Sequence, residues 1–83
     1  MTPVDYVRTL VIPLLSLPES LVLEVRDDEL GTLISMRVDK EDMKTVIGRG
    51  GQTVSSIRTL LRVFGGKTAA RLNLKLLEED EEA

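Results

Sequence analysis

The chain has 83 residues, of which 42% are hydrophobic, 11 are basic and 14 are acidic, for a formal net charge of −3. This length suits one domain with a single core. Cysteine and histidine are absent, which excludes disulfides, thiolate metal sites and the most common general base. We therefore expect a protein that is not an enzyme, has no cofactor and takes no small-molecule substrate. Without an apolar run of about 18 residues, we expect it to be cytoplasmic, with no membrane partner.

The first segment of the chain predicts a helix. Thr2 suits the N-cap, Pro3 suits the first helical position, and Asp5 suits the positive end of the helix dipole. Pro13 cannot donate a hydrogen bond to the carbonyl of Thr9, so the helix should bend or stop there. Helical spacing turns five apolar residues toward the core, namely Val4, Val7, Leu10, Val11 and Leu14.

Three apolar stretches with alternating polarity predict strands. Residues 21–26 and 33–38 flank the acidic turn Asp27-Asp28-Glu29 and should form an antiparallel hairpin, and residues 70–76 should form the last strand. The polar face of the sheet should include Glu24, Arg26, Ser35, Arg37, Arg71, Asn73 and Lys75. The inward side chains should be Leu21, Leu23, Val25, Ile34, Met36, Val38, Leu72, Leu74 and Leu76.

Two helices should lie between the hairpin and the last strand. Asp39 should cap the first, with Asp42 supporting its first turn, and the second should run to Phe64 and end at Gly65-Gly66. The order helix, strand, strand, helix, helix, strand predicts an α+β fold. We expect a three-stranded mixed sheet in the order 1-2-3, covered on one face by three helices.

The charges are divided unevenly along the chain. The segment from Lys44 to Lys75 contains seven basic residues and no acid, so all 14 acids lie outside it. This division is compatible both with an anionic partner and with an ordinary solvated face. Residues 78–83 carry five acids and little that could be buried. We expect residues 1–77 to form one domain and residues 78–83 a disordered acidic tail.

The segment between the two central helices predicts a phosphate-binding loop. Glycine lets a ligand backbone come close, and the start of the next helix offers unpaired N–H groups at its positive end. The loop is Gly48-Arg49-Gly50-Gly51, in which Arg49 adds a positive charge.

This loop lies in the stretch Val46-Ile47-Gly48-Arg49-Gly50-Gly51-Gln52-Thr53-Val54-Ser55-Ser56-Ile57, which resembles the KH-domain signature. The signature has an apolar pair, G-x-x-G, and apolar residues three and six positions later. The order of elements resembles the type II KH arrangement, and the small size is similar to the bacterial KhpA family. The resemblance implies that the loop clamps the backbone of about four nucleotides of single-stranded RNA. It also implies a homodimer or a heterodimer with a larger KhpB-like protein. The family's implied role is that of a post-transcriptional regulator or RNA chaperone linked to cell elongation and shape.

The resemblance also implies where the RNA lies. The groove should run between the G-x-x-G loop and the strand of residues 33–38, with the acidic hairpin turn closing it and repelling phosphate. The expected RNA-binding residues are Gly48, Arg49, Gly50, Gly51, Gln52, Lys44, Ile47, Ile34, Met36 and Arg58, with Arg62 as a further candidate. Each of these also has a purely structural interpretation, as core for the apolar residues and as surface charge for the cations.

Two other functions remain open from the sequence. The acidic turn and tail are compatible with a protein-interaction module of the same fold that has weak or no affinity for RNA. A helix, a glycine turn and a helix also resemble a DNA-binding helix-turn-helix, although the strands on both sides argue against it.

Overall fold

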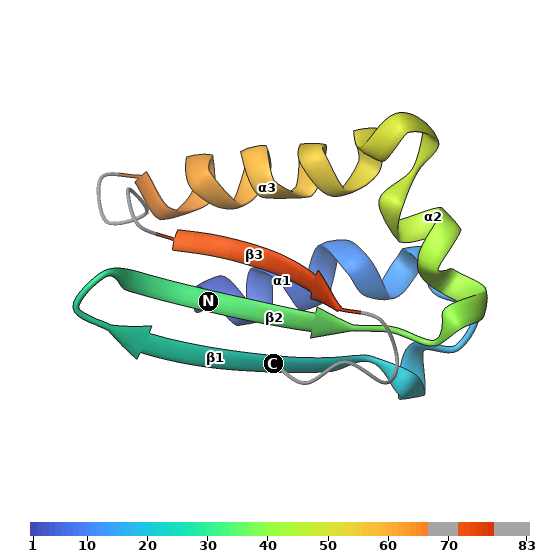
Figure 1. Ribbon diagram of the computed structural model, residues 1–83, viewed down its shortest axis with the longest axis horizontal. Coiled ribbons are helices and arrows are strands. Elements are labelled where there is room, and N and C mark those ends of the chain that lie inside the picture. Colours follow the sequence, from blue (N-terminus) through green and yellow to red (C-terminus); the bar gives the residue numbers. More distant parts are fainter. Residues whose placement is uncertain (67–71, 78–83) are drawn as a thin grey trace.

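The computed structural model describes residues 1–66 and 72–77 and has the expected order of elements (Figure 1). Four short 3₁₀ segments accompany the helices and strands. Ala70, Arg71 and the acidic tail lie outside the described residues, so the expectations for them are not tested. The helices and strands are α1 (Pro3–Val11), β1 (Val22–Asp28), β2 (Gly31–Arg37), α2 (Met43–Ile47), α3 (Gln52–Gly65) and β3 (Leu72–Leu77).

The three strands form one mixed sheet in the order β1-β2-β3, which confirms the predicted topology. β1 pairs with β2 in antiparallel orientation, with Val25 opposite Ile34, and β2 pairs with β3 in parallel orientation, with Ile34 opposite Leu74. β2 is therefore the central strand, and β1 and β3 are the two edges. This order decides which strand can face a ligand along its open side.

The predicted start and end of α1 are confirmed. The Thr2 side chain accepts a hydrogen bond from the N–H of Asp5, and the Asp5 side chain accepts one from the N–H of Thr2, which makes a capping box. The α-helix ends at Val11, and Ile12–Leu14 continue as a 3₁₀ turn around Pro13. Leu14 is exposed, contrary to the expectation, because the tighter turn changes the direction of its side chain.

One face of the sheet packs against all three helices. The core cluster joins inward residues of β2 and β3 to apolar residues of α1, α2 and α3, as predicted for a sheet covered on one face. The residues of this cluster are Val7, Val11, Leu21, Ile34, Met36, Val38, Val46, Ile57, Leu61, Leu72 and Leu74. No described helix is long and apolar enough to cross a membrane.

Three side chains of the sheet differ in burial from the alternating pattern that the sequence predicts for strands. Val25 was expected inside but is 48% exposed, because it lies on an edge strand beside the first turn of α1, where the helical layer begins. Ser35 was expected on the open polar face but is buried between the longer side chains of its partners Glu24 and Lys75. Leu77 is buried as well, next to the partly buried Leu76.

Asp42 has a different role from the one expected. Asp39 does accept a hydrogen bond from the N–H of Glu41, but Asp42 makes no capping bond to α2. Asp42 is only 1% exposed, and its two carboxylate oxygens accept hydrogen bonds from the backbone N–H groups of Ser16 and Leu17, at 2.8 and 3.0 Å. This buried carboxylate ties the segment after α1 to the start of α2. It thereby fixes the position of α2, the helix that leads into the glycine loop.

Candidate nucleic-acid interface

The loop between α2 and α3 is a tight turn built on three glycines. The N–H of Gly48 donates to the carbonyl of Lys44 at 2.9 Å and ends α2, and the N–H of Gly51 donates to the carbonyl of Gly48 at 3.2 Å. Gly48, Gly50 and Gly51 have φ values of 78°, 63° and 80°. All three lie in the region that side chains disfavour, which explains why this turn requires glycine.

The glycines serve two different purposes. A Cβ atom on Gly48 would lie 2.7 Å from both the backbone nitrogen and the Cβ of Thr53, and still closer to its Oγ1. A Cβ atom on Gly50 or Gly51 would meet nothing within 4 Å. Gly48 thus allows the loop to pack against the first turn of α3. Gly50 and Gly51 leave the outer surface of the loop open to a ligand.

The start of α3 offers hydrogen-bond donors beside this open surface. Its N-cap is Gly51, and no described side chain caps the helix, so the first turn lacks the acceptor that a serine or aspartate would supply. Arg49, Gly50 and Gln52 are exposed around it. The amide groups, the positive end of a 14-residue helix and Arg49 together favour an anion at this position.

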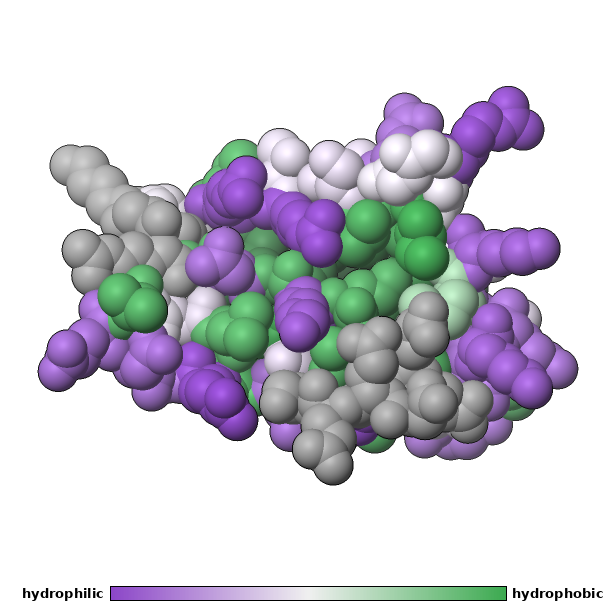
Figure 2. Space-filling view, viewed as in Figure 1, coloured by the Kyte–Doolittle hydropathy of each residue, from purple (hydrophilic) through white to green (hydrophobic). Residues whose placement is uncertain are grey.

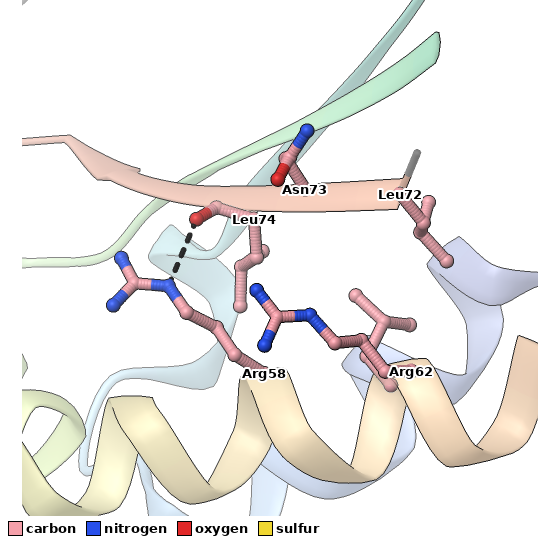
Figure 3. A pocket seen from close by; sticks show the side chains of 6 residues that line it. Arg58, Arg62, Leu72, Asn73 and Leu74 are labelled. Atoms are coloured by element: carbon pink, nitrogen blue, oxygen red, sulfur yellow. Dashed lines mark hydrogen bonds between the residues drawn. The ribbon is translucent and has the colours of Figure 1, made fainter. Parts of the chain in front are cut away.

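A shallow groove lies between α3 and β3. Figure 2 shows apolar side chains between these two elements with hydrophilic side chains standing over them. The groove includes a hollow of about 70 Å³ whose walls are Arg58, Leu61 and Arg62 from α3 and Leu72, Asn73 and Leu74 from β3. Arg58 Nε donates to the carbonyl oxygen of Leu74 at 3.1 Å and so links the helix to the edge strand (Figure 3).

The expected groove along residues 33–38 is not present. β2 is paired on both sides, and Ile34 and Met36 are 0% exposed, so neither side chain is open to solvent in this structure. The open strand edge beside α3 belongs to β3. Among the other expected residues, Lys44 is exposed, and Ile47 and Arg58 are partly buried.

Leu72, Asn73 and Leu74 were the residues that the sequence interpretation missed as part of the site. They carry no motif, and their alternating pattern is that of any strand with one buried face. The signal that was available was the strand order, since a sheet ordered 1-2-3 leaves its third strand at the edge.

The acidic hairpin turn also lies elsewhere. The β1–β2 turn and α2 are at opposite ends of the long axis of the molecule (Figure 1). The turn therefore does not lie beside the glycine loop; it lies at the end of β2 where Thr32 pairs with Leu72. A larger hollow of about 200 Å³ lies beside β1 and β2, and Val4, Val25, Asp27 and Ile34 are among the residues that line it. Its carboxylate and the neighbouring acids make it unsuitable for phosphate.

The charged side chains in the described part of the site are all positive. Arg58 and Arg62 have no carboxylate partner among residues 1–66 and 72–77, and this part of the chain has no cluster of acidic residues placed to hold a metal ion. Both the loop and the hollow therefore favour an anionic ligand.

Comparison with known proteins agrees with this geometry. The family model described as the KH domain of KhpA and KhpB matches residues 4–76. The "RNA-binding protein KhpA" of Listeria monocytogenes is 31% identical over 74 residues, which cover 89% of this chain and 97% of that protein. The protein of the same name from Borreliella burgdorferi is 31% identical over 75 residues, covering 90% and 92%. That of Mycobacterium tuberculosis is 33% identical over 64 residues, covering 77% and 80%.

Proposed function

Because this chain belongs to the KhpA/KhpB KH-domain family, we propose that it is an RNA-binding protein that holds the backbone of single-stranded RNA on Gly48, Arg49, Gly50 and Gly51. The observation that carries the proposal is the open loop at the start of α3. Its outer surface has room for a phosphate, donors without a side-chain cap and an adjacent arginine. Gln52 and Lys44 are exposed on either side of the loop and supply further polar contacts.

We infer that the RNA strand continues from the loop into the groove between α3 and β3. The hollow there is too small to enclose a nucleotide, and its leucines are only 1–7% exposed, so the bases lie over it beside Arg58, Arg62 and Asn73. Stacking on aromatic side chains is not part of this mode. The rings of Tyr6 and Phe64 stack on each other, with centroids 4.3 Å apart, and no other aromatic residue occurs in the chain.

The test is to reverse the charge of the loop without disturbing the fold. In the double variant Arg49→Asp and Gly50→Asp, both side chains point into open solvent, and aspartate tolerates the left-handed conformation at residue 50 better than most residues. We expect binding to a fluorescent single-stranded RNA to be lost, while the circular-dichroism melt remains cooperative and the melting temperature falls by no more than about 4–8 °C.

The matched control is Arg26→Asp, which reverses the charge of an exposed arginine on β1. It should retain RNA binding. Undiminished binding by the loop variant would refute the proposal. Comparing single-stranded RNA with duplex DNA of the same length tests the helix-turn-helix alternative, which requires preference for the duplex.

We also propose that the protein forms a homodimer or a heterodimer with a KhpB-like protein through the outer face of α3. Leu60, Val63 and Phe64 follow one another at helical spacing, and all three are exposed. One small groove contacts few nucleotides, and two linked grooves gain avidity without new contacts. On family membership alone, we propose that this binding serves post-transcriptional regulation or RNA chaperone activity linked to cell elongation.

Sedimentation velocity tests the association. Val63 is 73% exposed, so Val63→Glu should shift the full chain toward the monomer without unfolding it. Leu30→Glu is the matched control, because Leu30 is 82% exposed in the β1–β2 turn, away from this face. A wild-type chain that remains monomeric at high concentration would contradict self-association.

A further inference from the structure

Arg58 is held in one orientation across the groove. Its Nε–H donates to the carbonyl oxygen of Leu74 on the open edge of β3, at 3.1 Å. An arginine has five N–H groups in a rigid planar fork, and this bond uses one of them. Figure 3 shows the two terminal nitrogens directed away from Leu74 and from Arg62, Asn73 and Leu72, so they stand at one end of the hollow. The backbone of β3 therefore orients a pair of donors that has no partner among the described residues.

None of the described residues that line the hollow is acidic. Arg62 lies one helical turn further on and extends toward the same strand (Figure 3). Like charges at this spacing destabilise a helix. The other lining residues are three leucines and the exposed Asn73, whose amide both donates and accepts. The groove thus presents an excess of donors above an apolar wall.

We propose that Arg58 reads a base of the bound RNA and selects bases with two adjacent hydrogen-bond acceptors, guanine or cytosine, over adenine and uracil. This rests on the proposed RNA binding and adds the class of base. Guanine presents O6 and N7 side by side, and cytosine presents O2 and N3, both of which match two parallel N–H donors. Adenine places an amino donor beside N7, and uracil places its N3–H between its two carbonyl oxygens. Arginine donors cannot satisfy either arrangement.

The experiment measures the affinity of the full chain for five-nucleotide RNAs of the form UUXUU, by fluorescence anisotropy. With G or C at X, we expect binding about tenfold tighter than with A or U. Replacing guanine by 7-deazaguanine removes N7 and so destroys the acceptor pair of guanine, while the pair O2 and N3 of cytosine is unaffected. If guanine is read through O6 and N7, this change should abolish the advantage of guanine and leave that of cytosine.

Arg58→Lys is the decisive variant, because it keeps the charge and removes the fork. It should bind all four RNAs with similar affinity, whereas Arg26→Lys, a change of an exposed arginine on β1 outside the groove, should keep the discrimination. A thermal melt of each variant checks the fold. Equal binding of all four RNAs by the wild-type chain would overturn the inference and leave the proposed function intact. An equal loss for all four RNAs in Arg58→Lys would also overturn it, since that result assigns Arg58 to a phosphate. Absence of binding to every RNA would overturn both.

Discussion

Replacement of Gly48 by alanine should destabilise the fold far more than the same replacement at Gly50. Gly48 has φ 78° and ψ 174°, a region occupied almost only by glycine, and an added Cβ would lie 2.7 Å from the backbone nitrogen of Thr53. The backbone conformation alone costs on the order of 1–3 kcal/mol, and the clash adds a similar amount because a backbone atom cannot move aside. We expect a total loss of about 3 kcal/mol in the free energy of unfolding.

Gly50 provides the comparison at the same loop. Its φ of 63° and ψ of 21° are left-handed, but its Cβ would meet nothing, so alanine there should cost about 1 kcal/mol. At roughly 4–8 °C per kcal/mol, the melting temperature should fall by about 12–24 °C for Gly48→Ala and by about 4–8 °C for Gly50→Ala. Adding Thr53→Ala should not rescue Gly48→Ala, because the nitrogen of residue 53 stays in place. Equal losses in the two single variants, measured by circular dichroism, would refute this reasoning.

Four further expectations follow from single features of the chain. Asp42→Ala leaves two partly buried N–H groups without their acceptor and should lower the free energy of unfolding by about 2 kcal/mol, and Asp42→Asn, which keeps one acceptor, should lower it less in urea titrations. The hydrogen bonds from Thr2 lower the pKa of Asp5 below its ordinary value of 3.8, so its stabilising effect should be complete above about pH 4 and disappear as the pH falls through the lowered pKa. Melts of wild type and Asp5→Asn should therefore converge at low pH. Arg49→Gln should weaken binding to every RNA sequence and reduce the slope of log K against log salt by about 0.7. Truncation after Leu77 removes five acids and should tighten RNA binding at low salt but not near 1 M, where the screening length is about 3 Å.

The fold could be predicted from the sequence because each element has a local signal. The capping box at Thr2 and Asp5, the stop before Pro13 and the strand alternation all reflect interactions between near neighbours in the chain. Leu14 and Val25 were misplaced because their exposure depends on where the helical layer ends, and that is a property of the assembled fold. The misassigned role of Asp42 has the same origin, since its partners lie 25 and 26 residues away.

The candidate site, too, could be predicted only where local sequence signals determine it. The glycine loop was found from the sequence because its backbone angles and the contact with Thr53 admit almost no other residue, so the chemistry leaves a recognisable motif. The wall of the groove was not found, because Leu72 and Leu74 are ordinary core-facing residues of a strand. Their importance comes from the edge position of β3 beside α3.

In the proposed mode of binding, the two parts of the surface act differently. A loop made of backbone N–H groups and one exposed arginine would meet phosphates, which are the same in every sequence, so it would contribute affinity and position. A groove with an arginine bonded to a strand carbonyl would meet base edges, which differ, so it would contribute discrimination. The part of the site that is easiest to recognise in a sequence is then the part that says least about which RNA is bound. Specificity among relatives that share the loop should accordingly depend on the residues at the positions of Arg58, Arg62 and Asn73.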